Sequence, residues 1–308
     1  MLTDTTDKSL PIYEALASNV RLQMIRALSE KDMNVSELAQ STGLSTAIMT
    51  MHVKKLLKAG IIRTDMMPSK GGVQKICSLV IDRIEIEFPS KEISQREFHQ
   101  TIVSVGHYTD FNIEPTCGLA TAENIIGEFD DPRFFLDPER VNAKILWFSQ
   151  GYIEYRVPNY LLKSQIPTEL EISMEISSEA PFTNNNWPSD ISFYVNEVKL
   201  GTWTSPGDYG DKPGKFTPAW WPAVVNQYGL LKSLRVTHEG TYMDGIKLSN
   251  VTLEMLDISR KQWTFRVAVP EDAVHVGGVT IFGSSFGNYD QDIQFNLYYN
   301  KAEASTNG

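Results

Sequence analysis

Cysteine is scarce in this chain of 308 residues. Only Cys77 and Cys117 are present, and neither has a second cysteine at the spacing of a C-x-x-C motif. A framework of disulfides and a cysteine-based zinc site are therefore not expected. Two isolated thiols are typical of reduced cytoplasmic proteins, so we expect both to be free.

Long apolar segments are also lacking. No run of about 18 apolar residues occurs, which argues against a membrane span. The opening segment, MLTDTTDKSLPIYEALA, contains no basic stretch followed by an apolar one, so we expect no secretory signal. These features predict a cytoplasmic protein that does not contact a membrane.

Catalytic and metal-binding motifs are missing as well. His99, His107, Asp110 and Cys117 have side chains that can ligate metal, but their irregular spacing matches no zinc motif. We therefore predict no catalytic residues, no metal and no cofactor, and we expect that the protein is not an enzyme.

Charge is present but unevenly distributed. The chain has a net charge of −10, yet residues 45–81 contain six basic residues against the single acidic residue Asp65. A positive segment on an acidic protein is typical of a DNA-binding module attached to another domain. The basic residues are Lys54, Lys55, Lys58, Arg63, Lys70 and Lys75.

The first eighty residues have the pattern of short helices followed by a hairpin. Asn34 and Ser45 are good N-caps for the segments VSELAQST and TAIMTMHVKKLLKA, and Gly43 separates them because glycine readily adopts left-handed backbone. Strand-like residues then surround a PSKGG turn. This succession predicts a winged helix-turn-helix over residues 1–82.

The second helix of this motif is expected to enter the major groove of duplex DNA, and the wing is expected to contact phosphates or the minor groove. Thr46 and Thr50 are four residues apart and share one face, so their hydroxyls are candidates for base contacts. The full set of predicted DNA-binding residues is Ser45, Thr46, Thr50, Lys54, Lys55, Lys70, Gln74 and Lys75.

The stretches ALASNVRLQMIRAL, VSELAQSTGLS, HVKKL and AGII resemble the arsenic-repressor (ArsR-type) winged-helix family in order and spacing, over about residues 10–80. The resemblance implies a homodimer that reads a two-fold related operator. The thiolate pair of the family's metal sensors is absent from DMNVSEL, so metal is not expected to be the signal. Ala47, Ile48 and Met51 replace polar residues usual in the family, which favours methyl contacts and DNA shape in base readout.

The middle of the chain, residues 83–145, is predicted to connect two domains through a strand, a helix and loops. The segment RIEIEF alternates apolar and charged residues, as a half-buried strand does. Ser94 and Glu97 have the spacing of a capping box ahead of Phe98, which predicts a helix there. Residues 106–145 are expected to be rich in loops.

Residues 146–300 have the pattern of an all-β domain, followed by a tail at 301–308. Short runs rich in β-branched and aromatic residues, such as YIEYRV and WTFRVAV, alternate with turn-forming clusters. This pattern predicts a jelly-roll-like β-sandwich, and hence a multidomain α+β protein.

Several tryptophans of this domain lie in loop-like segments with polar neighbours, whereas Trp203 and Trp263 lie in strand-like runs and are expected in the core. Flat aromatic faces stack on sugar rings, and polar groups in the same loops bind hydroxyls. The predicted ligand-binding residues are Trp187, Asp208, Tyr209, Trp220, Trp221, His238 and Asp290.

The same half also resembles the C-terminal half of a subgroup of such regulators from carbohydrate-using Gram-positive bacteria, on stretches that include CGLATAENIIGEFDDPRFF, LGTWTSPGDYG and FGNYDQDI. The resemblance implies a carbohydrate-binding effector domain. The leading hypothesis is a dimeric transcriptional regulator that responds to a saccharide.

Two alternatives stay open. The sandwich could serve only dimerisation or partner binding. It could also be a DNA-tethered glycoside hydrolase, which would need paired carboxylates from among Asp190, Glu239, Asp244, Asp290 and Asp292.

Overall fold

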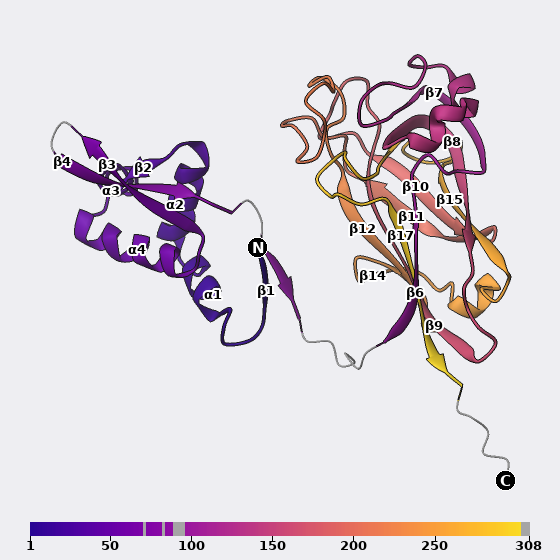
Figure 1. Cartoon of the computed structure of the whole chain (residues 1–308), viewed down its shortest axis with the longest axis horizontal. Helices are drawn as coiled ribbons and strands as arrows, with labels where there is room; N and C mark the ends of the chain where they lie inside the picture. Colours follow the sequence, from indigo (N-terminus) through magenta and orange to yellow (C-terminus); the bar gives the residue numbers. More distant parts are fainter. Residues whose placement is uncertain (70–71, 82–83, 89–95, 303–308) are drawn as a thin grey trace, which may run out of the picture. The chain divides into compact units, whose positions relative to one another are not determined.

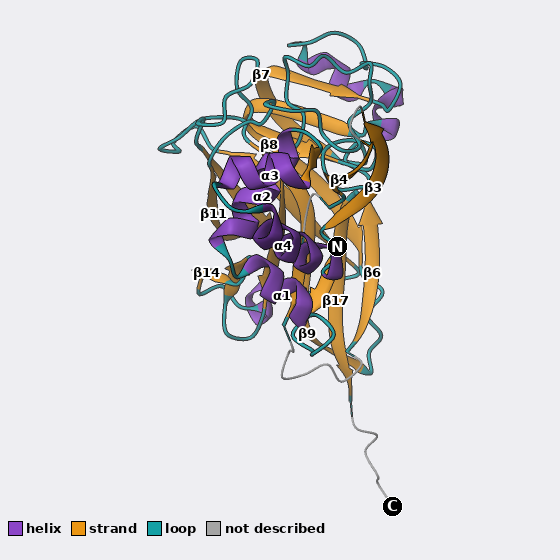
Figure 2. Cartoon of the chain, turned by 90° about the vertical axis from the view of Figure 1, so that its left-hand side faces the viewer, coloured by secondary structure: helices purple, strands orange, loops and turns teal. Residues whose placement is uncertain are grey.

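The computed structural model describes residues 1–69, 72–81, 84–88 and 96–302. The chain divides into two compact units, Met1–Ser94 and Gln95–Gly308 (Figure 1). Helices are concentrated in the first unit, whereas strands and loops make up most of the second (Figure 2). No helix in the described ranges is long and apolar enough to cross a membrane.

The first unit contains four helices, α1 (Leu10–Leu16), α2 (Asn19–Glu30), α3 (Val35–Thr42) and α4 (Thr46–Lys58). The predicted caps are confirmed. Asn34 and Glu37 form a capping box at α3, and Gly43 ends that helix with φ +69°. Ser45 caps α4. The helices bury one shared apolar core that includes Met24, Leu38 and Met49.

The predicted wing is also confirmed. Strands β3 (Ile62–Ser69) and β4 (Gly72–Leu79) pair antiparallel, and the short β2 (Met33–Asn34) extends this sheet on β4. A second small sheet pairs β1 (Leu2–Asp4) with β5 (Glu85–Glu87) in parallel. The predicted strand at 83–88 therefore exists, with the start of the chain as its partner.

The second unit is a β-sandwich, as predicted. One layer follows the order β11 (Val198–Ser205), β10 (Ser189–Val195), β15 (Gln262–Val269), β8 (Ile145–Pro158) and β7 (Asp110–Ala120). The other follows the order β6 (Glu97–Val103), β17 (Ile293–Lys301), β9 (Gln165–Ser177), β12 (Leu230–Val236), β13 (Thr241–Met243) and β14 (Ile246–Ser249). The strand β16 (Val279–Phe282) pairs with β8 and with β9, so it joins the two layers.

Alternating side chains from both layers fill the interior. In β15, Trp263, Phe265 and Val267 are buried, and Phe295 of β17 contacts the first two rings. Trp263 is thus a core residue, as expected, and Trp203 packs half-buried against the same core. Short 3-10 helices, η1 (Pro132–Leu136), η2 (Pro138–Asn142) and η3 (Leu253–Leu256), lie in the connections.

Two expectations for residues 83–145 are wrong. The segment expected to be a helix after Glu97 is the strand β6, because β17 offers it a complete antiparallel ladder from Glu97 to Val103. Non-local pairing outweighs the local capping signal, and Ser94 itself lies outside the described residues. Residues 110–120, expected to be loop, form β7 against β8 despite Pro115, with an irregular register between Glu114 and Cys117.

Candidate functional sites

The helix α4 presents an exposed polar face beside the turn that follows α3. Its buried face consists of Met49, Val53 and Leu56. The predicted residues Ser45, Thr46, Thr50, Lys54 and Lys55 are all exposed. The side-chain oxygen of Ser45 accepts the N–H of Ile48, at a nitrogen–oxygen distance of 3.4 Å. The amino-terminal half of α4 is therefore capped by the chain itself and open on its outer side.

The two threonines differ in how free their hydroxyls are. The Thr50 hydroxyl donates to the backbone oxygen of Thr46 at 2.7 Å, so its proton is engaged within the helix and its oxygen remains an acceptor. Ile48 and Met51 lie on the same exposed side and are 44% and 66% exposed. This surface offers methyl groups and few hydrogen-bond donors.

The wing supplies part of the predicted set. Lys75 is half-buried and pairs in register with Met66 across the hairpin. The Gln74 side-chain oxygen accepts from the Asn34 amide at 3.0 Å, so Gln74 connects the wing to the cap of α3. Lys70 lies outside the described residues. Exposed apolar residues, Met66, Met67 and Val73, flank these positions.

Arg21 holds α4 in place, a role that the sequence did not indicate. Its side chain is buried and donates to the backbone oxygens of Ala15 and Glu14, at 2.7 and 2.6 Å. Its guanidinium also lies 3.2 Å from Nδ1 of His52 in α4. Burial and the adjacent Arg21 charge lower the pKa of His52. One buried cation thus joins the end of α1 to α4.

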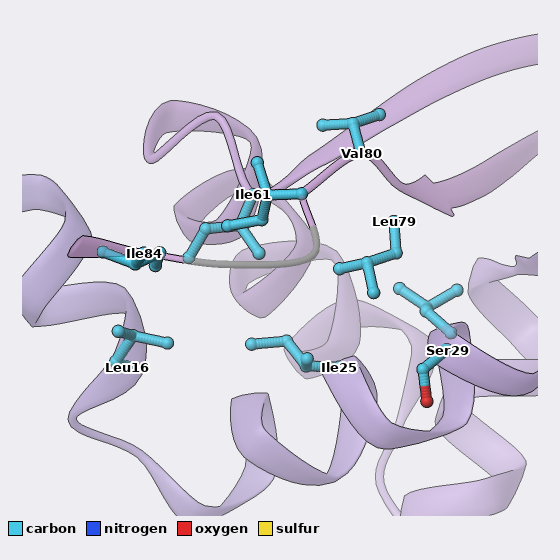
Figure 3. Close-up of a pocket in the computed structure, with 9 residues that line it drawn as sticks. Leu16, Ile25, Ser29, Ile61, Leu79, Val80 and Ile84 are labelled. Atoms are coloured by element: carbon cyan, nitrogen blue, oxygen red, sulfur yellow. The ribbon is translucent and has the colours of Figure 1, made fainter. Parts of the chain in front are cut away.

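An apolar groove of about 850 Å³ lies on the first unit (Figure 3). Helices α1 and α2 contribute Leu16 and Ile25, and the end of the wing contributes Leu79 and Val80. Val80 is 47% exposed. The remaining lining residues are Leu28, Ser29, Ile61, Ile81 and Ile84.

In the second unit, the structure gathers most of the predicted ligand residues at one end of the sandwich. Backbone hydrogen bonds join Asn184 to Asp208 and Trp187 to Pro206, and Tyr209 stacks on Tyr228 at 5.3 Å between ring centroids. Trp221 contacts Trp220 at 5.5 Å and Phe286 at 5.2 Å. Asp290 accepts from the Ser285 N–H in the loop that carries Phe286.

His238 does not belong to this group. The strand β12 begins at Leu230, which pairs with Ile176 at the end of the sandwich where the aromatic residues gather. It ends at Val236, which pairs with Leu170, and His238 follows two residues later. His238 therefore lies at the opposite end of β12, where its ring contacts the Glu254 carboxylate.

A cavity of about 310 Å³ opens at the end of the sandwich where the aromatic residues gather. Trp221 is the one predicted ligand residue that lines it. The other lining residues were not predicted, and they are Thr116, Phe129, Asp130, Trp147, Glu179, Ala180, Pro181, Phe182, Val224, Val225 and Asn226.

The aromatic rings of the cavity form a connected cluster. Trp147 contacts Trp221 edge-on at 5.8 Å, and Phe129 contacts Trp147 at 5.3 Å. The Trp221 indole N–H donates to the backbone oxygen of Asn226 at 2.9 Å. Outside the cavity, the Trp220 indole N–H donates to the backbone oxygen of Ala122 at 2.6 Å, although the ring remains 38% exposed. The indole groups are thus fixed before any ligand is present.

A carboxyl group lies among these rings. Oε2 of Glu179 accepts from the Asn226 amide at 3.0 Å and from the Thr280 hydroxyl at 2.9 Å. Burial, and secondly the nearby Asp208, raise the pKa of Glu179 well above its usual value. Asp208 is itself fully buried, and this burial raises its pKa to about 7. Burial therefore favours the protonated form of both acids, a form that exposed carboxyl groups rarely adopt at neutral pH.

Three of the five carboxylates considered for glycoside hydrolysis are engaged in separate contacts. Asp190 binds Thr204 and His275, Asp244 binds Lys232, and Asp292 binds Ser284. Within the described residues, no group of three or more His, Cys, Asp or Glu side chains is arranged to hold a metal ion.

Comparison with known proteins matches residues 18–64 to the family described as bacterial regulatory protein, arsR family. This segment, from α2 into the wing, is an arsR-type helix-turn-helix, as the sequence predicted. No curated protein sequence matches the chain.

Three solved structures illustrate the similarities. HlyU from Vibrio cholerae N16961 is 24% identical, over 23% of this chain and 74% of its own, with a TM-score of 0.21. NolR from Sinorhizobium fredii is 24% identical, over 25% of this chain and 72% of its own, with a TM-score of 0.22. A carbohydrate-binding module, CBM36, in complex with calcium and xylotriose is 9% identical, over 64% of this chain and 98% of its own, with a TM-score of 0.28.

Proposed function

We propose that this chain is a cytoplasmic transcriptional regulator that binds a duplex DNA operator through α4 and the wing. The observation that supports the proposal is the exposed face of α4 within an arsR-type segment. Thr46 and Thr50 lie at its amino-terminal half, Lys54 and Lys55 follow, and residues 46–58 contain no acidic residue. Such a helix fits a major groove with its first turns toward base edges and its lysines toward phosphates.

We further propose that the protein acts as a homodimer and that the groove of Figure 3 contributes to the contact between the two copies. Eight of the nine residues that line the groove are apolar, Val80 among them is exposed, and apolar surface of this kind is commonly covered by a partner. Two copies related by a two-fold axis would read the two halves of a palindromic operator.

A single substitution tests the dimer. Val80→Asp places a charge in the groove and should shift the chain from dimer to monomer in sedimentation experiments, with loss of operator affinity. Val274→Asp makes the same change at a residue of the second unit that is 86% exposed, and it should leave both properties unchanged. A Val80→Asp protein that remains dimeric would remove the groove from the dimer contact.

For the second unit we propose that the aromatic cavity binds a small effector, a saccharide, and that binding alters operator affinity. The cavity supports this proposal because it combines aromatic walls with a fixed carboxyl group, that of Glu179. Its volume of about 310 Å³ lies at the lower end of the range for small-molecule sites. An effector that favours one of two dimer arrangements would change DNA binding by the difference between its affinities for the two.

The test is an operator-binding assay with the full chain. Operators selected from random duplexes are titrated with protein, with and without a panel of monosaccharides, while tryptophan fluorescence reports on the cavity. A saturable fluorescence change together with a shift in operator affinity is expected. If the panel changes neither fluorescence nor melting temperature, the β-sandwich serves another role, such as dimerisation or partner binding.

A further inference from the structure

The ionisable groups that line the aromatic cavity are all acidic. Glu179 and Asp130 line it, and the described lining residues include no lysine, arginine or histidine. Asp208 lies beside Glu179, and its Oδ2 accepts the N–H of Ala180, another lining residue, at 3.2 Å. An anionic ligand would therefore meet only like charge.

The two acids have unused hydrogen-bonding capacity. Asn226 and Thr280 both bind Oε2 of Glu179, and no described residue donates to Oε1. Oδ1 of Asp208 is buried and has no partner among the described residues. Buried polar atoms of native proteins are nearly always paired, so the buried, unpaired Oδ1 of Asp208 indicates a missing donor, and Oε1 of Glu179 can accept from a ligand in the cavity.

The aromatic walls of the cavity restrict the kind of hydrogen-bond donor that a ligand can carry into it. The rings of Trp147, Trp221, Phe129 and Phe182 line the same cavity as Glu179, and aromatic rings attract cations. A ring with many hydroxyls would find few protein partners here, because the Asn226 amide nitrogen already donates to Glu179 and Thr280. A compact ligand with one positive donor group satisfies the site better than a neutral polyol.

We infer that the cavity selects a ligand with a protonated amine, which pairs with the Glu179 carboxylate between the aromatic walls. Among saccharides this means an amino sugar, and to that extent the inference rests on the proposed effector site. The amine itself does not require a sugar. Cys117 and Asp130 are the other titratable groups near Glu179, and neither supplies a positive charge to it.

Matched ligand pairs test the inference on the full chain. Glucosamine and glucose, galactosamine and galactose, and cyclohexylamine and cyclohexanol differ mainly in the amine. At a pH of about 6.5, where such amines are protonated, the amine of at least one pair should bind about tenfold to a hundredfold more tightly than its neutral partner. The pKa of Glu179 is raised well above its usual value, so pairing with a cation should release a proton, and the binding heat should then depend on the ionisation enthalpy of the buffer.

Two variants assign the effect to Glu179. Glu179→Gln keeps the size of the side chain and an oxygen for Asn226 and Thr280, and it should abolish both the amine preference and the buffer dependence. Asp130→Asn removes a charge from another lining residue and should retain most of the preference. Melting curves of both variants establish that they are folded.

The outcomes separate the two proposals. Equal binding of sugars and their amines would overturn the amine inference and leave the saccharide effector in place. Glu179-dependent binding of cyclohexylamine, with no binding of any sugar, would support the amine inference and refute the saccharide. Binding of none of the six compounds would refute both.

Discussion

The Arg21 guanidinium and the His52 ring lie 3.2 Å apart, a cation facing an imidazole that has to remain neutral. The pKa of His52 is lowered by burial and by this charge, so the folded state binds a proton less readily than the unfolded chain does. The contact connects the stability of α4 to pH.

We predict that the first unit loses stability as the pH falls below about 6.5, the usual pKa of histidine. The loss continues down to the lowered pKa of folded His52, because the unfolded chain takes up the proton first. The protection factors of α4 peptides in hydrogen–deuterium exchange, which correct for the slower intrinsic exchange at lower pH, should decrease between pH 7 and 5. In His52→Gln this decrease should be absent, and its persistence would assign the effect to another group.

Operator affinity should depend on the lysines of α4 and the wing. Replacing Lys54, Lys55, Lys70 or Lys75 with alanine should weaken binding to all sequences and reduce the salt slope by roughly one per lost phosphate contact. Lys301→Ala changes the charge by the same amount at a residue paired with Glu97, and it serves as the control. Unchanged slopes for Lys70→Ala and Lys75→Ala would exclude the wing from the interface.

Base preference should depend more on Thr46 than on Thr50, since the Thr50 hydroxyl proton already binds the Thr46 backbone. Thr46→Ala should reduce the free-energy preference for one base pair of the selected operator by about 1–3 kcal/mol. Thr50→Ala should change that operator less. Operators selected with each variant from random duplexes provide the measurement, and identical sequences from both would indicate readout of DNA shape.

The two neighbouring tryptophans should respond differently to truncation. Trp221 is buried against Trp147 and Phe286, so Trp221→Ala should cost about 3–5 kcal/mol of unfolding free energy. Trp220 is partly exposed, and its replacement should cost much less. Denaturant unfolding compares the two variants. A ligand response lost in stable Trp220→Ala would bring Trp220 into the site, although it does not line the cavity.

Asp208 should make the second unit less stable as the pH rises. Its pKa of about 7 in the folded state lies above the ordinary aspartate value, so the folded state holds the proton longer than the unfolded chain. The contribution of Asp208 to the free energy of unfolding should therefore be largest below pH 4, and it should decline as the pH rises to about 7. Asp208→Asn should flatten this decline in melting curves. A variant with the wild-type pH profile would contradict the assignment.

The first unit could be predicted from the sequence because its signals are local. Asn34, Glu37, Gly43 and Ser45 act on backbone groups within a few residues, and each does so in the structure. The prediction of a helix after Glu97 was wrong because the interaction that decides this segment is not local. Its partner strand begins at Ile293, and no local pattern reports a ladder formed across so much of the chain.

The cavity could be predicted only in part. The tryptophans near prolines indicated the loop that carries Trp221, and this residue lines the cavity. Trp147 lies in a strand whose neighbours are core residues, and Glu179 follows the end of another strand, so nothing in their local sequence suggests a shared site. His238 was misplaced because the loops at the two ends of a sandwich have similar compositions.

The strand β16 also limits how the second unit can move. Val279–Phe282 hydrogen-bonds to both layers, and Thr280 within it holds the Glu179 carboxyl. Sliding of one layer over the other would break both ladders, so the sandwich is expected to remain rigid and to unfold as one cooperative block. A signal that starts in the cavity therefore has to leave through the surrounding loops, and backbone dynamics there, rather than in the strands, should change when a ligand binds.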